Sequence, residues 1–359
     1  MKILHIETGR HLYGGALQVF YLLRGLHAAG IENILVCAPG SEIGRKCTGI
    51  ATVVELPTIG DIDPRLLIGL CRTIRRYRPD IVHAHSRRGA DWWGGIAAQI
   101  CGVKSVLTRR VDNPESALLV RLKYNRYDRV VTISEGIRQV LLSEGVDEKH
   151  VELIHSVVDL EQYHCPADRP WFEQEFSLHP GEQTVAIIAQ LIERKGHRFL
   201  LAGAEKIFAA VPNLRFIFFG QGPHRQELEA DCQARGLGDK VIFAGFRDDL
   251  PRVLPNLDLI VHPALMEGLG VSLLQAAAAG RPMIGARAGG IPEVIRDGVN
   301  GYLVPPGEVN LLAEKTIELL LHRDLAEAFG ARGKRLVEEE FSIPTMISSY
   351  QRLYARLLR

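Results

Sequence analysis

Residues 3–37 read ILHIETGRHLYGGALQVFYLLRGLHAAGIENILVC, and this stretch decides the fold. A short apolar run at 3–6 leads through a glycine-containing loop to an amphipathic segment of helical period at 16–29, and a second apolar run follows at 34–37. The order strand, helix, strand predicts two parallel strands joined by a helical crossover. We therefore expect an α/β fold built on a doubly wound parallel sheet.

The same alternation continues through the first half of the chain. Further buried strands are expected at 53–56, 81–83, 106–108 and 130–133, and helices at 64–78, 90–101, 117–127 and 135–144. These segments complete one parallel sheet with helices on both faces.

Residues 161–182 interrupt this alternation with three prolines and mixed polar and aromatic residues. A second series of strands is then expected at 185–188, 216–219, 241–243, 259–261, 283–284 and 302–304, followed by helices at 311–321 and 325–339. We therefore predict two domains, residues 1–165 and 166–342, whose sheets face each other across a central cleft. The final segment, about 343–359, is expected to form a helix that packs back on the first domain.

The composition is that of a globular protein. The 359 residues carry 43 Lys and Arg against 42 Asp and Glu, and 47% are hydrophobic, which excludes a disordered chain and a nucleic-acid-coating polymer. Residues 60–130 hold 14 basic and 7 acidic residues. This surplus either attracts an anionic lipid or acidic acceptor, or reflects dispersed surface arginines.

Cysteine usage and hydropathy indicate the compartment. The six cysteines form no Cys-x-x-Cys pair and have no histidine partners at metal-ligand spacing, so we expect reduced, mostly buried thiols. The N-terminus has no leader-like segment, and no run of eighteen apolar residues follows, which excludes a spanning helix. We expect a cytoplasmic protein, and peripheral contact with the inner face of the membrane stays open.

Two motifs of the first predicted domain lie where strands end, at the edge of a parallel sheet that binds ligands. Gly14 and Gly15 precede the first helix, whose free N–H groups can hold a phosphate, although paired glycines also form ordinary turns. His83 and His85 end the fourth strand, and we expect their imidazoles to point in opposite directions. One of them would face the cleft and hydrogen-bond a sugar hydroxyl, and a histidine without a role is the alternative.

Three loops of the second predicted domain open at the corresponding edge. Lys195, which precedes Gly196, can oppose a pyrophosphate as a point charge, or belong to a solvated cationic loop. The turns at 220–223 (GQGP) and 245–247 (GFR) could form the walls of a nucleobase pocket, or be common turns.

The most informative motif is Glu267-Gly268-Leu269-Gly270, which follows the predicted strand at 259–261. The glycines allow the backbone to approach a ligand, and a helix that starts near Gly270 offers N–H groups to an anion. Glu267 could alternatively cap this helix, but capping does not require two glycines.

Together these motifs resemble the retaining glycosyltransferases of family 4, also called group 1, which have the GT-B architecture of two Rossmann-like domains. The resemblance covers nearly the whole chain. It also includes residues 289–301, which read GGIPEVIRDGVNG and, with the motif at 267–270, are the most specific part.

The resemblance implies transfer of a sugar from a UDP- or GDP-sugar to a glycan or lipid-linked acceptor, with anomeric retention and without a metal or other cofactor. Glu267 would hold the donor sugar, Lys195 would neutralise the diphosphate, and His85 would contact the transferred sugar near the reacting centre. The other donor-binding residues are expected to be Gly15, Gln190, Gly220, Gly222, Phe246, Arg247, Gly268, Leu269, Gly270, Val271 and Gln275.

Three details bear on this interpretation. Gln275 stands where the family usually has a second glutamate, and Gln190 stands where it usually has an arginine. A neutral amide makes weaker hydrogen bonds than a charged group, and Arg194 is the candidate to replace the missing arginine. A carboxylate pair, Asp61-Ile62-Asp63, matches a metal-binding string but precedes Pro64, so helix capping is expected.

The acceptor is expected in the first domain. Arg87, Arg88, Arg109 and Arg110 follow predicted strands and suit an anionic or lipid-linked sugar, as in lipopolysaccharide or exopolysaccharide synthesis. Two other functions stay open: a nucleotide-sugar epimerase of the same architecture, and a non-catalytic partner subunit of a glycosyltransferase.

Overall fold

The computed structural model describes residues 1–12, 14–57, 63–85 and 89–359. The chain divides into two compact units, one comprising Met1–Val157 with Ile343–Arg359 and the other Val158–Ser342. This division comes earlier than the expected one after residue 165. The reason is that the backbone N–H of Val158 donates to Phe341 O at 3.0 Å and Val158 pairs with Ser342, both in the second unit.

The first unit contains a seven-stranded sheet in the order β3-β2-β1-β4-β5-β6-β7. Every neighbouring pair is parallel. Its elements are β1 Lys2–Glu7, α1 Gly15–Ala28, β2 Glu32–Cys37, α2 Glu42–Lys46, β3 Thr52–Glu55, α3 Pro64–Tyr77, β4 Ile81–Ala84, α4 Ala90–Cys101, β5 Lys104–Arg109, α5 Ala117–Tyr124, β6 Arg129–Thr132, α6 Glu135–Ser143, β7 Val151–Leu153 and α16 Ile343–Leu357. The strand order reverses between β1 and β4, which is where open α/β sheets bind ligands.

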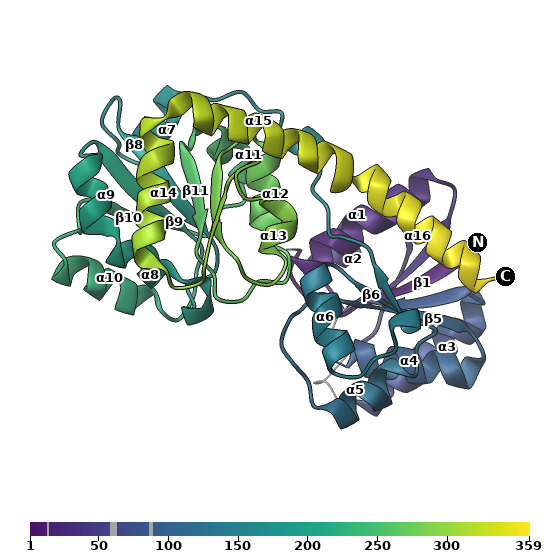
Figure 1. Ribbon diagram of the computed structural model, residues 1–359. Helices are drawn as coiled ribbons and strands as arrows, with labels where there is room; N and C mark the ends of the chain where they lie inside the picture. The colour runs from purple at the N-terminus through teal and green to yellow at the C-terminus, as the bar shows by residue number, and fades with distance from the viewer. Residues whose placement is uncertain (13, 58–62, 86–88) are drawn as a thin grey trace. The chain divides into compact units, whose positions relative to one another are not determined.

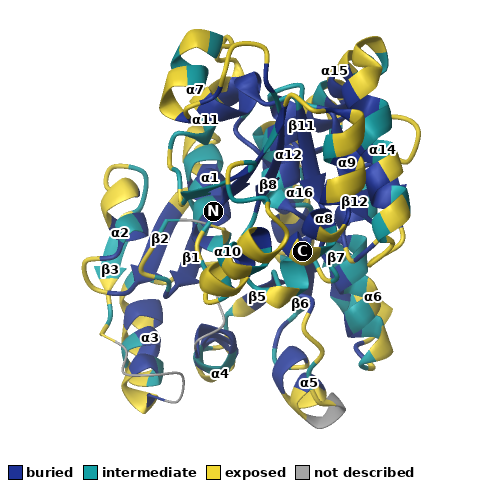
Figure 2. Cartoon of the chain, turned by 90° about the vertical axis from the view of Figure 1, so that its left-hand side faces the viewer, coloured by how far each residue is buried: buried dark blue, intermediate teal, exposed yellow. Residues whose placement is uncertain are grey.

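Helices cover both faces of this sheet, and Figure 2 shows the strands buried between them. On one face α1 and α16 pack on a core that includes Ile3, Tyr350 and Tyr354. In Figure 1 the yellow α16 accordingly lies beside the purple α1, although the two helices stand at opposite ends of the sequence. The other face is covered by α3 and α4.

The second unit contains a six-stranded parallel sheet in the order β10-β9-β8-β11-β12-β13. Its elements are α7 Arg169–Glu175, β8 Gln183–Ile188, α8 His197–Ala202, α9 Ala204–Ala210, β9 Leu214–Phe219, α10 Arg225–Ala234, β10 Val241–Gly245, α11 Leu250–Val253, β11 Leu259–His262, α12 Val271–Ala278, β12 Met283–Ala286, α13 Ile291–Val294, β13 Tyr302–Val304, α14 Val309–Leu321 and α15 Arg323–Glu340. Short 3₁₀ turns lie at 148–150, 160–163, 193–195 and 254–256 of the chain. The order reverses between β8 and β11, so the loops that leave these strands lie together at one edge.

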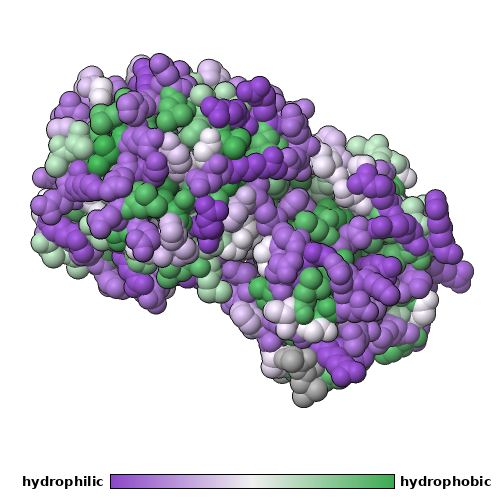
Figure 3. Space-filling model, viewed as in Figure 1, coloured by the Kyte–Doolittle hydropathy of each residue, from purple (hydrophilic) through white to green (hydrophobic). Residues whose placement is uncertain are grey.

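Two parallel α/β sheets confirm the predicted fold class. On the face that Figure 3 shows, each unit is largely hydrophilic with scattered apolar residues. Among the described helices, none is both long and apolar enough to cross a bilayer. The carboxylate of Asp63 accepts from Arg65 N at 3.0 Å and caps α3, as expected; Asp61 lies outside the described residues.

Candidate functional site

The carboxylate of Glu267 is the centre of a polar cluster in the second unit. Its Oε2 atom lies 2.6 Å from Lys195 Nζ and 2.7 Å from His262 Nε2, and its Oε1 accepts from Gly268 N at 3.1 Å. Lys195 comes from the loop after β8, whereas His262 ends β11, the strand next to β8. The reversal of strand order therefore brings together Lys195 and Glu267, for which the sequence predicted separate roles in binding one donor.

This cluster is largely shielded from water. The side chains of Lys195 and Glu267 are 12% and 15% exposed, and His262 is buried. Burial alone would raise the pKa of Glu267, but hydrogen bonds and charge from His262 and Lys195 outweigh it and hold the pKa well below its usual range. Glu267 is therefore an anion that accepts hydrogen bonds at neutral pH.

The loops after β8, β9 and β10 are joined by backbone hydrogen bonds. Leu191 N donates to Gln221 O at 3.0 Å, and Gly220 N donates to Gly245 O at 2.7 Å. A Cβ atom on Gly220 would lie 2.0 Å from Ala189 O, and one on Gly222 would lie 2.2 Å from Leu191 O. These two glycines are thus required for packing of the loops on one another, a reason that the sequence did not supply.

The remaining predicted donor residues of the second unit are distributed around the same edge. Gln190 and Phe246 are exposed in their loops. Gly270 precedes α12 with φ of 90°, Leu269 is buried beside it, and Val271 and Gln275 are partly exposed on the helix.

Arg247 is placed differently from expectation. Its guanidinium donates to both carboxylate oxygens of Asp249, at 2.7 and 2.5 Å, and to Glu175 at 2.5 Å. These carboxylates raise the pKa of Arg247. Its side chain is therefore engaged in holding its own loop, which argues against direct binding of a donor phosphate.

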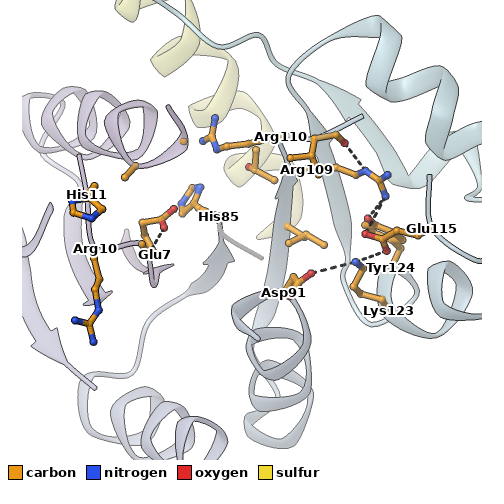
Figure 4. A pocket seen from close by; sticks show the side chains of 16 residues that line it. Glu7, Arg10, His11, His85, Asp91, Arg109, Arg110, Glu115, Lys123 and Tyr124 are labelled. Atoms are coloured by element: carbon orange, nitrogen blue, oxygen red, sulfur yellow. Dashed lines mark hydrogen bonds and ion pairs between the residues drawn. The ribbon is translucent and has the colours of Figure 1, made fainter. Parts of the chain in front are cut away.

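The first unit holds a pocket of about 370 Å³ at the carboxyl ends of β1, β4 and β5. Figure 4 shows Glu7, His85 and Arg110 grouped on one side and Asp91, Glu115 and Lys123 on the other. The pocket also borders Gly15 at the start of α1.

One wall of this pocket is a buried ion-pair network. Lys123 Nζ lies 2.5 Å from Glu115 Oε2 and 3.2 Å from Asp91 Oδ2. Arg109 donates to Tyr124 Oη at 2.5 Å and to the carbonyls of Val111 and Asn113, and its Nη1 lies 3.4 Å from Glu144. Arg109 is 4% exposed, so its donors are used to build the wall and the structure does not leave it open to an acceptor, contrary to expectation.

Arg110 points the opposite way, toward Glu7 and His85 (Figure 4). Its Nη1 makes a long 3.5 Å contact with Ser156 Oγ, and its Nε is buried without a partner. A Cβ on Gly15 would lie 3.1 Å from Arg110 Cδ, which places this cation beside the N-terminus of α1. Arg87 and Arg88 lie outside the described residues.

The two histidines of β4 do not point in opposite directions, so that prediction was wrong. Positions i and i+2 of a strand share a face, and the rings of His83 and His85 lie 3.8 Å apart between centroids. His5 of β1 joins them, with Nδ1 3.0 Å from His85 Nε2. All three are buried.

These three imidazoles lie close enough to suggest a metal site, which the separation of His5 in the sequence concealed. Two observations argue against it. His83 uses both ring nitrogens, at 2.7 Å each, with Tyr354 Oη and Thr108 Oγ1, and the positive charge of Arg110, which acts on both His83 and His85, would repel a metal ion. The cluster is therefore better suited to hydrogen bonding than to holding a cation.

Sequence reasoning missed His5 and His262. His262 could have been found, because it is a polar residue at the carboxyl end of a predicted strand, directly before the Glu267 loop. His5 stands inside an apolar strand and gave no signal.

Comparisons with known proteins identify the family. Residues 169–336 match the family model described as glycosyl transferases group 1, and residues 13–162 match that of glycosyltransferase family 4. A 2-deoxystreptamine N-acetyl-D-glucosaminyltransferase of Streptomyces fradiae is 30% identical, over 83% of this chain and 80% of its own. The N-acetyl-alpha-D-glucosaminyl L-malate synthase of Bacillus anthracis is 26% identical over 83% and 80% of the two chains.

Solved structures show the same fold. Anabaena HepE in complex with UDP-glucose has a TM-score of 0.85 at 20% identity and covers 99% of this chain and 100% of that one. A glycosyltransferase of Rickettsia africae has a TM-score of 0.87 at 19% identity, with 100% and 98% covered.

The family models and the fold together define a nucleotide-sugar glycosyltransferase with GT-B architecture. The chain belongs to glycosyltransferase family 4, a retaining family that does not require a metal. This membership sets aside the epimerase and the non-catalytic subunit as interpretations.

Proposed function

We propose that this enzyme transfers a sugar from a UDP- or GDP-sugar to an anionic glycan or lipid-linked acceptor, in the synthesis of lipopolysaccharide or exopolysaccharide. The observation that carries the donor half is the 2.6 Å contact between Lys195 and Glu267 at the strand-reversal edge of the second unit. An ammonium opposes a diphosphate, and a carboxylate accepts hydrogen bonds from sugar hydroxyls.

The second unit supplies what departure of a nucleoside diphosphate needs. Negative charge grows on the leaving group as the glycosidic bond breaks, and Lys195 together with the N-terminus of α12 stabilises it. Glu267 holds the hydroxyls of the sugar so that the anomeric carbon is oriented toward the acceptor. Backbone groups of residues 268–271 contact the same ligand. The neutral amide of Gln275 forms a hydrogen bond with the ribose.

The first unit supplies the acceptor site and His85. Arg110 is the acceptor-binding cation that the structure favours, because Arg109 is engaged in the pocket wall. Gly15 brings backbone N–H groups to the same pocket. Relatives with anionic or lipid-related acceptors in their names support this class: a D-inositol 3-phosphate glycosyltransferase of Mycobacterium marinum and the lipopolysaccharide core glycosyltransferase LpsE of Rhizobium meliloti, 28% and 25% identical.

Peripheral contact with the inner membrane face fits a basic stripe on α3. Arg72, Arg75 and Arg76 are exposed on this helix beside Ile68, which is 49% exposed. Guanidinium groups attract anionic headgroups at short range, and an apolar side chain can enter the headgroup region. We expect sedimentation with vesicles that contain anionic lipid, a loss of sedimentation in a triple Arg→Gln variant of α3, and no binding to neutral vesicles.

The donor is tested by titrating the protein with UDP, GDP and ADP and with their sugars, using calorimetry. One nucleotide series should bind, and Lys195→Ala should weaken it, whereas Lys206→Ala, which removes a lysine paired with Glu314 on the surface, should not. Activity is then followed by NMR of the product, which should retain the anomeric configuration of the donor. Binding of no nucleotide, or unchanged binding in Lys195→Ala, would contradict the proposal.

A further inference from the structure

His85 is held by a second buried imidazole that lies outside every motif of the family resemblance. Nε2 of His85 lies 3.0 Å from Nδ1 of His5, and the planes of the two rings are nearly parallel, 13° apart. Two neutral imidazole nitrogens at this distance share one hydrogen, so one ring donates and the other accepts. Which one donates decides the chemical character of the other nitrogen of His85.

Asn33 on β2, beside β1, decides the direction. Its Nδ2 donates to Leu23 O at 3.0 Å and to Ile50 O at 3.4 Å, so both amide hydrogens are used. A carbonyl oxygen cannot accept from another carbonyl, and the amide therefore cannot be turned around. Toward His5 it can offer only Oδ1, which is an acceptor.

The buried side chain of His5 interacts with Asn33. Oδ1 of Asn33 and Nε2 of His5 are both buried without another hydrogen-bond partner, and because the Asn33 side chain acts on His5 as a hydrogen-bonding group, we infer that these two atoms face each other. The Asn33 side chain also partly offsets the fall of the His5 pKa, to about 3, that burial causes. An acceptor at Asn33 places the hydrogen of neutral His5 on Nε2, so Nδ1 of His5 carries a lone pair.

From this chain of contacts we propose that His5 is a positioning residue that fixes the tautomer of His85. Nε2–H of His85 donates to His5 Nδ1, and Nδ1 of His85 is left as a lone pair. Nδ1 is buried without a protein partner, and His85 lines the pocket. His85 thereby accepts a hydrogen bond from a hydroxyl of the bound sugar; this last step rests on the proposed function, whereas the tautomer does not.

His83 restricts the orientation of the His85 ring. It lies against His85 at 3.8 Å between centroids, and it is itself held by Thr108 of β5 and Tyr354 of α16. Burial, followed by the neighbouring His83, His5 and Arg110, lowers the pKa of His85, which keeps the ring neutral. A neutral ring with a fixed tautomer presents an acceptor to the pocket without reorganisation.

The tautomer is tested on the wild-type protein, whether or not its substrates are known. ¹⁵N-histidine labelling distinguishes a ring nitrogen that carries hydrogen from one that carries a lone pair. The signals of His85 are identified among the thirteen histidines by their loss in His85→Gln. We expect Nε2 of His85 to carry the hydrogen and Nδ1 the lone pair; the reverse pattern, or an equal mixture, would overturn the inference.

The role is tested with two substitutions at position 5. His5→Asn places an amide oxygen near the position of Nδ1 and keeps an acceptor, whereas His5→Phe keeps the ring volume and removes it. We expect His5→Phe to lower kcat about tenfold with little change in donor KM, and to give mixed His85 tautomers, and His5→Asn to restore both toward wild type.

A purely structural role predicts otherwise. In that case both variants would lose thermal stability and activity together, with the His85 tautomer unchanged, and the inference would fail. Absence of transfer by the wild type with every donor that binds would instead count against the proposed function, since the tautomer assignment needs no turnover.

Discussion

Glu267→Gln separates the two tasks that the Lys195–Glu267 contact performs. The substitution keeps the shape of the side chain and removes its charge, which leaves Lys195 without its 2.6 Å partner and His262 without its 2.7 Å acceptor charge. Breaking a buried ion pair costs about 3–5 kcal/mol, and an exposed pair under about 1 kcal/mol. Because the Lys195 and Glu267 side chains are 12% and 15% exposed, we expect the free energy of unfolding of the second unit to fall by about 2–3 kcal/mol.

The two ligands should respond in opposite ways. A nucleoside diphosphate must compete with Glu267 for Lys195, so the free diphosphate should bind Glu267→Gln as tightly as wild type or more tightly. A nucleotide sugar loses charge-assisted hydrogen bonds worth about 1.5–3 kcal/mol, or roughly 10- to 150-fold in affinity and in kcat/KM. Calorimetry with both ligands measures this difference. Glu314→Gln, which breaks the exposed 2.8 Å pair with Lys206, is the control and should change neither.

The fall of thermal stability at acid pH gives an independent check of the role of Glu267. The pKa of Glu267 is lower in the folded protein than its ordinary value of 4.5, so its ionised form stabilises the fold above about pH 4.5 and this contribution fades as the pH falls. The Tm of wild type should exceed that of Glu267→Gln at pH 7, and the gap should narrow below about pH 4.5. Equal losses of diphosphate and nucleotide-sugar affinity, or a Tm gap that widens in acid, would refute the reasoning.

Three further predictions concern two glycines, two arginines and the metal dependence of the reaction. Gly289→Ala places a Cβ 1.9 Å from Glu267 O at a residue with φ of 51°, and we expect its free energy of unfolding in urea to fall by at least about 3 kcal/mol. For Gly298→Ala, where φ is 71° but the added Cβ meets open space, we expect a fall of about 1 kcal/mol. Arg109→Gln should lower Tm because it leaves the buried carboxylates of Glu115 and Glu144 without this cation, whereas Arg110→Gln should keep Tm and reduce kcat/KM for an anionic acceptor about tenfold. The opposite pattern would reverse the roles assigned to the two arginines. EDTA should leave turnover unchanged, and rescue by manganese after inactivation would contradict the metal-independent chemistry.

The fold could be predicted well because buried parallel strands and amphipathic helices leave a periodic record in the sequence. Strand β7 and the five-residue helix α2 were not predicted. Helix α2 is too short to show a helical period, and β7, which reads VEL, has a charged residue where the predicted strands have apolar runs. The Lys195 and Glu267 motifs could be placed at one edge of the sheet because both follow strands that end there, but their direct contact was not predicted. Arg109 misled the prediction, since position after a strand does not reveal that Glu115, Glu144 and Tyr124 surround its guanidinium.

Residues outside the motifs set the state of the residues inside them. Ionised Glu267 can only accept, so His262 must carry hydrogen on Nε2, and a histidine buried at the end of β11 thereby helps to keep that carboxylate ionised. In the first unit Asn33 and His5 act on His85 by the same rule, through hydrogen bonds that admit one direction only. A polar residue buried inside a strand costs stability unless its partners are exact. The presence of such a residue next to a site residue is therefore explained by the hydrogen bond that it directs. Other residues of this kind should be sought first among the polar side chains of the strands on either side of the reversal in each sheet.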